Sequence, residues 1–167
     1  MTAPAIHGAV RHIDDVPHLT ITRRLAGSAQ DAWRDLTASD RLEGWIGRWE
    51  GDPASGHVDF FMTAEGQDVE AERYTILECD PPRRFAGDTS SPAGAWHLWF
   101  ELSEAGDETM LTFGQRLDPG VDLASVGPGW EYYLDRLVAM RSGRDVDAVE
   151  WDAYYPAMSE QYAALRG

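Results

Sequence analysis

Histidine is the first side chain to consider for chemistry in this sequence, because imidazole binds metal ions and transfers protons near neutral pH. The chain contains five: His7, His12, His18, His57 and His97. No two of them have a metal-binding spacing with carboxylates on a common face. The three N-terminal ones fall in a segment that we expect to be a mobile arm. The sequence therefore predicts no metal site.

Motifs for nucleophilic and nucleotide chemistry are missing as well. The chain has no G-x-S-x-G turn, no P-loop and no G-x-G-x-x-G turn, and no Lys follows the Gly-Pro-Gly sequence at 127–129. Cys79 is the single cysteine and cannot form an internal disulfide. Although Arg83 and Arg84 follow it, we expect a buried thiol at the end of a strand. We expect no cofactor.

Catalysis inside an apolar pocket would need polar groups whose pKa burial shifts toward the working pH. Gln115 is the clearest inward-facing polar residue, because it shares strand parity with Leu111, but an amide cannot act as a general acid or base. Tyr74, Tyr133 and Glu101 are weaker candidates, and Glu101 has the parity of the outer face of the predicted sheet. The pattern assembles no acid–base pair, which favours binding over catalysis.

The clearest apolar surface belongs to a helix predicted to start at the Gly-Pro-Gly sequence and to end near Gly143, which suits a left-handed cap. Its polar face carries Glu131, Tyr132, Asp135 and Arg136. The opposite, apolar face has residues spaced i, i+3, i+4, i+7 and i+8: Trp130, Tyr133, Leu134, Leu137 and Val138. Such a helix needs an apolar surface to lie on.

The elements before this helix supply that surface. A strand is predicted at 18–25, where apolar and polar residues alternate. Two short helices follow, one capped by Ser28 and the other by Ser39 or Asp40.

From residue 48 to 117 the pattern has a period of two, with five or six antiparallel strands separated by Gly-, Pro- and Asp-rich turns. One exception lies at 69–79, where Tyr74 and Ile76 oppose Thr75 and Leu77 in parity. A β-bulge would reconcile the two pairs, but the pattern does not place it.

Composition limits the partners. The chain has 167 residues, enough for one domain, and a formal net charge of −15, with 14 basic residues that are all Arg. The electric field of so many negative charges repels phosphate backbones and anionic lipids, so we expect no nucleic-acid or membrane partner. Neither a signal peptide nor an 18-residue apolar run is recognisable, so we expect a cytoplasmic protein.

The order of these elements resembles the START-like, or SRPBCC, superfamily, and within it the branch of heat-shock-protein-90 ATPase-activator homologues. The likeness rests on HLTITRRLAGSAQDAWRDLTASDRLEGWIG, ILECDPPRRF, FELSEAGDETMLTF and GPGWEYYLDRL, and it covers roughly residues 16 to 141. The resemblance implies an α+β helix-grip fold. In it, a curved antiparallel sheet of six or seven strands wraps around a long C-terminal helix, and two short helices follow the first strand.

The resemblance also implies a cavity between the helix and the concave sheet, which in various members holds apolar molecules. Strand parity and helical spacing indicate which residues of this chain face such a cavity. We expect the following ones to contact a ligand there: Trp45, Phe60, Met62, Tyr74, Trp96, Leu98, Phe100, Leu111, Phe113, Gln115, Trp130, Tyr133, Leu134 and Leu137. For each of them singly, filling the core is the alternative. Together, so many aromatic rings favour a pocket.

Three parts of the chain are expected. Residues 1–15 form a flexible N-terminal arm and 16–143 the helix-grip domain. Residues 144–167 form a helical extension with one apolar face: Trp151, Tyr155, Met158, Tyr162 and Leu165. This face packs on the domain or, in the alternative, at a homodimer interface.

Three functions are compatible with these features. The first is binding of a small apolar or aromatic molecule. The second is an enzyme of the polyketide cyclase or dehydratase type that uses the same cavity. The third is a co-chaperone-like interaction module, which an exposed apolar patch around Trp99 would favour, although His97 and Glu101 beside it indicate a solvated outer face.

Overall fold

The computed structural model describes residues 5–65, 70–91 and 94–165. Within them an antiparallel sheet of eight strands has the order β1-β2-β8-β7-β6-β5-β4-β3. The strands are β1 Gly8–Ile13, β2 Val16–Ala26, β3 Arg48–Glu50, β4 His57–Phe61, β5 Glu72–Asp80, β6 Arg84–Ser91, β7 Gly94–Ala105 and β8 Glu108–Arg116. The helices are α1 Ala29–Thr37, α2 Ser39–Leu42, α3 Leu123–Arg141 and α4 Ser159–Leu165, with 3-10 turns η1 Pro53–Ser55, η2 Thr63–Glu65, η3 Val146–Ala148 and η4 Trp151–Ala153.

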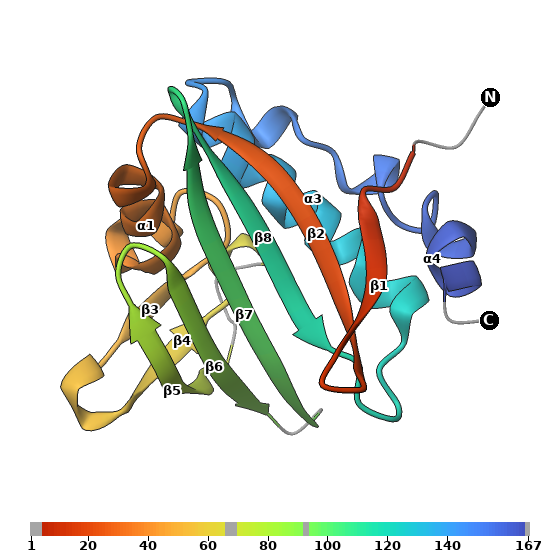
Figure 1. The fold of residues 1–167 in the computed structure, drawn as a ribbon, viewed down its shortest axis with the longest axis horizontal. Helices are drawn as coiled ribbons and strands as arrows, with labels where there is room; N and C mark the ends of the chain where they lie inside the picture. Colours follow the sequence, from red (N-terminus) through yellow and green to blue (C-terminus); the bar gives the residue numbers. More distant parts are fainter. Residues whose placement is uncertain (1–4, 66–69, 92–93, 166–167) are drawn as a thin grey trace.

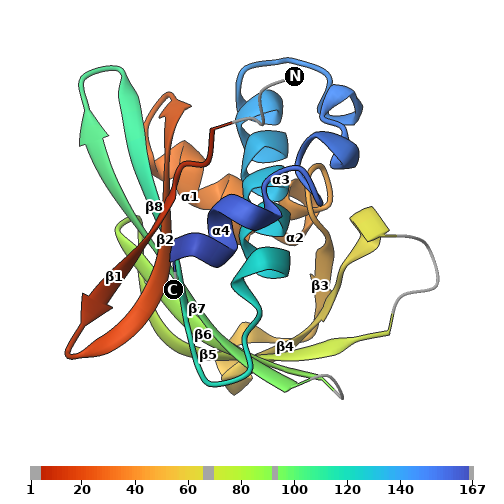
Figure 2. The same ribbon diagram turned by 90° about the vertical axis from the view of Figure 1, so that its right-hand side faces the viewer.

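The sheet curves around α3, with α1 and α2 inserted between β2 and β3 (Figures 1 and 2). This confirms the predicted α+β helix-grip fold with its long C-terminal helix and its two short helices. The sheet has eight strands where the sequence predicts six or seven. No helix in the described ranges has the length and apolar composition needed to cross a membrane.

The additional strand is β1, in the segment predicted to be a flexible arm. Its residues pair with β2 from Gly8 opposite Ile21 to Ile13 opposite Val16. Asp14 and Asp15 form the connecting turn with positive φ angles of 50° and 65°, as a two-residue hairpin requires. The strand is hard to recognise because Gly8, Arg11 and His12 interrupt its apolar pattern.

Helix α3 starts earlier than predicted. It begins at Leu123, with Asp122 as its N-terminal cap, and continues through Pro128. Proline lacks the N–H that would bond to the carbonyl of Ala124 four residues before it. The hydroxyl of Ser159 donates to that carbonyl at 2.8 Å instead. A contact from α4 thus satisfies the group that Pro128 leaves free.

The bulge that parity required in β5 lies between Ile76 and Glu78, where the register against β6 shifts. It leaves Leu77 unpaired and 54% exposed. Tyr74, which precedes the bulge, belongs with Ile76 to the face toward the interior of the fold.

The C-terminal extension is an α-helix only after Pro156. Residues 146–153 form two 3-10 turns, and only α4 is an α-helix. Met158 and Tyr162 are buried against the domain, whereas Trp151, Tyr155 and Leu165 remain exposed. Figure 1 shows α4 beside β1.

On the outer face of the sheet, Trp99 is covered and not solvated. Only 2% of its surface is exposed. Its indole N–H donates to Nδ1 of His18 at 3.0 Å, and the guanidinium groups of Arg11 and Arg84 lie 5.8 and 5.2 Å from its ring centre. The expected solvated face is therefore a packed cluster at this position.

This cluster makes stability depend on pH. Burial is the largest cause that lowers the pKa of His18 below its usual 6.5. The positive charges of His97, Arg116 and Arg11 lower it further, while Asp118 opposes the shift. Between pH 6.5 and its lowered pKa, His18 binds a proton in the unfolded chain but not in the folded one. Stability should therefore decrease as the pH falls through this window.

The measurement is urea unfolding at pH 7.5, 6 and 5 for the wild type and His18→Gln. We expect the free energy of unfolding to fall less with acidification in the variant. Equal falls in the two proteins would contradict the role given to His18.

Candidate functional site

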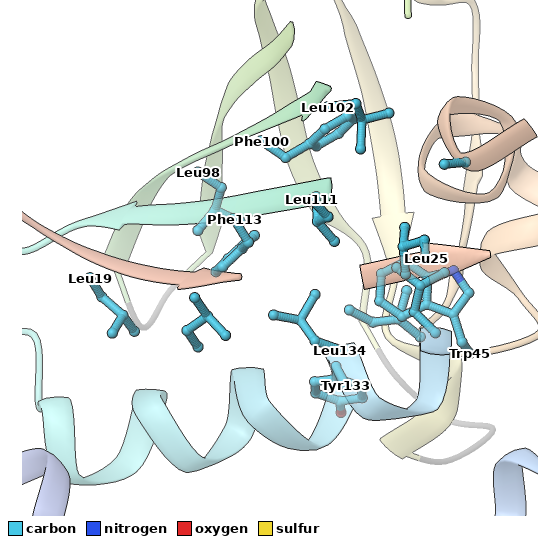
Figure 3. Close-up of a cluster of buried hydrophobic side chains, with 14 of the residues drawn as sticks. Leu19, Leu25, Trp45, Leu98, Phe100, Leu102, Leu111, Phe113, Tyr133 and Leu134 are labelled. Atoms are coloured by element: carbon cyan, nitrogen blue, oxygen red, sulfur yellow. The ribbon is translucent and has the colours of Figure 1, made fainter. Parts of the chain in front are cut away.

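A cavity of about 800 Å³ lies between the concave face of the sheet, the α1–α2 region and α3. Figure 3 shows a cluster of buried side chains that includes part of its wall, where Leu98, Leu111 and Phe113 extend from the sheet toward α3 and Leu134 points back at them. The cavity therefore separates part of α3 from the strands of the sheet.

Twelve of the fourteen residues expected to contact a ligand line this cavity: Trp45, Phe60, Met62, Tyr74, Trp96, Leu98, Phe100, Leu111, Phe113, Trp130, Tyr133 and Leu134. Parity brings the strand residues together because side chains on one face of a strand recur every second residue. Whether they bind a ligand remains a prediction.

Gln115 and Leu137 lie behind the wall, and both are fully buried. The side-chain oxygen of Gln115 accepts a hydrogen bond from the indole N–H of Trp130 at 2.7 Å. Its amide nitrogen has no hydrogen-bond partner within the described residues. Gln115 therefore orients Trp130, and Leu137 fills the core under α3.

One side of the wall is a sheet-side aromatic row, made of Phe60, Tyr74, Phe85, Phe100 and Trp33. Successive ring centres are 6.4, 5.9, 5.6 and 5.4 Å apart. The rings come from β4, β5, β6, β7 and α1, so the row crosses the sheet and holds neighbouring strands together through ring contacts.

The other side is a helix-side aromatic row around Trp130, which contacts Phe113 at 4.4 Å, Tyr133 at 6.3 Å and Trp96 at 6.4 Å between ring centres. Trp96 and Trp151 are 38% and 43% exposed. Because both also line the cavity, they mark its rim.

Indole groups of the wall are held from behind. The N–H of Trp45 donates to the carbonyl of Asp35 at 2.9 Å, and that of Trp49 to the carbonyl of Thr37 at 2.8 Å. With Trp130 bound to Gln115, three indole donors are used by the protein itself. Their apolar ring surfaces are what remains for a ligand.

Charge is scarce in this wall. Among the described lining residues Glu72 is the one with a charged side chain. Tyr74, two residues further along β5, brings a phenol to the wall. Burial, together with the negative charge of Asp88, raises the pKa of Tyr74 well above its usual 10. The phenol thus keeps its proton.

Besides Trp99, whose indole belongs to the outer face of the sheet, four aromatic lining residues were not among the predicted contacts: Trp33, Trp49, Phe85 and Trp151. Trp33 lies with Leu36 on one face of α1, which was a usable signal. Phe85 follows two prolines and two arginines that hide the start of β6. Trp151 comes from the extension, whose path over the domain no local pattern reveals.

The sequence and the fold are similar to those of known proteins. Residues 26–141 match a sequence family described as activator of Hsp90 ATPase homolog 1-like protein. No curated protein matches the sequence significantly.

Solved structures are similar over most of the chain. CalU16 from Micromonospora echinospora has a TM-score of 0.71 at 25% identity, over 95% of this chain and 94% of its own. EF2215 from Enterococcus faecalis, a conserved protein of unknown function, has a TM-score of 0.71 at 18% identity, over 96% and 92%. DynU16, a protein in the dynemicin biosynthetic locus, has a TM-score of 0.63 at 16% identity, over 77% and 49%. The last two similarities concern the fold alone.

Proposed function

Because the chain belongs to the family of activator of Hsp90 ATPase homolog 1-like proteins, a branch of the START-like fold, we propose that it binds a small apolar or aromatic molecule between the sheet and α3. The observation that carries this proposal is the cavity of about 800 Å³ with two aromatic rows in its wall. Sites for drug-sized ligands have volumes of roughly 300–1,000 Å³ and mostly apolar walls. The cavity falls within this class.

Catalysis in the same cavity has less support. A cyclase or dehydratase would need a proton donor and acceptor whose pKa values lie near the working pH. Burial moves the pKa of Tyr74 away from that range. The described wall adds Glu72 as its charged group and contains no His. A binding role fits these side chains better than acid–base catalysis does.

A co-chaperone-like role would be favoured by an exposed apolar patch on the outer face. Trp99, the residue expected to centre it, is covered by His18, Arg11 and Arg84. The observations at this face therefore do not favour that function.

Native mass spectrometry of the freshly purified protein, followed by denaturation, tests the proposed function. We expect a released apolar compound in near-stoichiometric amount, whose identification names the ligand class. An apo mass combined with no saturable binding of aromatic probes would contradict the proposal.

A pair of identical substitutions distinguishes the cavity from the core. Leu98→Trp adds bulk toward the cavity and should change the free energy of unfolding by less than about 1 kcal/mol while abolishing ligand binding. Leu137→Trp adds the same bulk to a packed site and should cost about 1–3 kcal/mol or more. Urea unfolding of both variants provides the measurement. Equal destabilisation would indicate that side chains fill the space around Leu98.

A further inference from the structure

We infer that the cavity selects an aromatic molecule with an uncharged carbonyl or ether oxygen, and not a carboxylate, through a hydrogen bond from the Tyr74 hydroxyl. This inference rests on the proposed function of the cavity and adds the chemical class of the ligand and the residue that selects it.

The charge of the wall excludes anions. Glu72 is the one charged side chain among the described lining residues, and it is acidic. No Arg or His of the described chain lines the cavity. A carboxylate entering it would lose its hydration without gaining a cationic partner, which disfavours its binding. The formal net charge of −15 adds a repulsive field.

The ring of Tyr74 is held in one orientation by its surroundings. It lies against Gly87 of β6, where an added Cβ would be 2.2 Å from the ring carbon Cε1. Phe60 and Phe85 contact it on either side in the sheet-side aromatic row. Because Gly87 provides the space and the two rings restrict movement, the hydroxyl has a fixed position relative to the wall.

That hydroxyl is available to a ligand. Tyr74 lines the cavity, and its hydroxyl makes no hydrogen bond to the part of the chain that the structure describes. Because burial raises the pKa of Tyr74, the group keeps its proton and acts as a donor. A ligand that supplies an acceptor keeps this partly buried donor hydrogen-bonded, whereas a hydrocarbon that displaces water from it leaves the donor without a partner.

Three indole donors in the wall are already bound. The indole N–H groups of Trp45, Trp49 and Trp130 donate to oxygen atoms of the protein. A ligand that packs on these rings therefore contacts carbon surfaces. These three indoles therefore do not compete with the Tyr74 hydroxyl for an acceptor on the ligand.

Three naphthalene probes of nearly equal shape test the inference: 2-acetylnaphthalene with a neutral acceptor, 2-ethylnaphthalene without one, and 2-naphthoate with a charge. Their dissociation constants are measured by equilibrium dialysis with the wild type and with Tyr74→Phe, which removes only the hydroxyl. Tyr155→Phe is the matched control, because Tyr155 is exposed and outside the cavity lining, and the substitution keeps its ring contact with Trp151. Near-UV circular dichroism verifies that each variant keeps its packing.

We expect Tyr74→Phe to weaken 2-acetylnaphthalene by roughly threefold to tenfold and to leave 2-ethylnaphthalene unchanged. Binding of 2-naphthoate to the wild type should be at least about thirtyfold weaker than that of the ketone. The control variant should bind all three probes as the wild type does.

Two failures are distinguishable. If the hydrocarbon and the ketone bind but Tyr74→Phe affects them equally, or if 2-naphthoate binds as tightly as the ketone, the inference about ligand class is wrong and the binding function stands. If none of the probes binds the wild type saturably, the proposed function itself is contradicted.

Discussion

Replacing Glu131 with alanine should lower the free energy of unfolding by about 3–5 kcal/mol, because the change leaves a buried cation without its closest partner. Glu131 is fully buried in α3, and its Oε1 lies 2.6 Å from Nη2 of Arg23 on β2. Its Oε2 accepts hydrogen bonds from the Tyr162 hydroxyl at 2.8 Å and from the backbone N–H of His7 at 2.7 Å. One carboxylate thus joins the sheet, the helix and both terminal segments.

Urea unfolding at neutral pH measures this effect, and Glu108→Ala is the control. Glu108 forms an ion pair with Arg24 at 3.6 Å, but both side chains are largely exposed. Pairs of that kind contribute at most about 1 kcal/mol. If the two substitutions cost the same, Glu131 does not hold the segments together.

The burial of Glu131 shows a limit of pattern-based inference. Its face of α3 is polar in the sequence, but Tyr162 of α4 and the backbone of His7, just before β1, cover it. Helical periodicity separates polar from apolar faces without indicating what packs on either. Arg23 was the available signal, because it alternates with Leu and Ile toward the interior of β2 and needs a carboxylate partner there.

The residues that line the cavity were easier to predict in the sheet than elsewhere. On β7 and β8, a period of two assigns Leu98, Phe100, Leu111 and Phe113 to the inner face, and the structure has them there. On β5 the conflict of parity correctly required a bulge. Strand parity depends on local geometry alone, which is why it transfers from sequence to structure.

Tertiary contacts decided the remaining elements. Pro128 should interrupt a helix on local grounds, but α3 continues because Ser159 bonds the carbonyl of Ala124. Trp151 reaches the cavity rim because the extension folds back over α3, where its ring centre is 5.1 Å from that of Tyr132. Both effects come from residues after 143, whose position no pattern within α3 specifies.

Tyr162 is the residue through which the extension is anchored, and Tyr162→Ala should cost about 3–5 kcal/mol of unfolding free energy. Its side chain is completely buried. It occupies space that two glycines leave open, since an added Cβ would be 2.3 Å from the ring hydroxyl at Gly8 and 2.4 Å from ring carbons at Gly127. Removing the ring empties this site and also removes a donor to Glu131.

A double-mutant cycle with Gly127→Ala tests whether that contact exists in solution. Alone, Gly127→Ala forces its Cβ into the Tyr162 ring and should cost about 1–3 kcal/mol. In the Tyr162→Ala background this collision is absent, so the cost of Gly127→Ala should be smaller by a similar amount. Placing an alanine directly before Pro128 has a steric cost of its own, but that cost is the same in both backgrounds and cancels. Gly129→Ala is the matched control, because its Cβ meets only Trp151 at an ordinary 3.9 Å.

The cycle also decides between the two places proposed for the extension. If α4 packs on its own domain, Gly127→Ala and Tyr162→Ala couple by about 1–3 kcal/mol at every protein concentration. If α4 instead packs at a homodimer interface, Tyr162 does not contact Gly127 of its own chain. The free energy of unfolding then depends on protein concentration, and dilution weakens the coupling between Gly127→Ala and Tyr162→Ala. Additive costs at low concentration would therefore contradict the packing of Tyr162 between Gly8 and Gly127 within one chain.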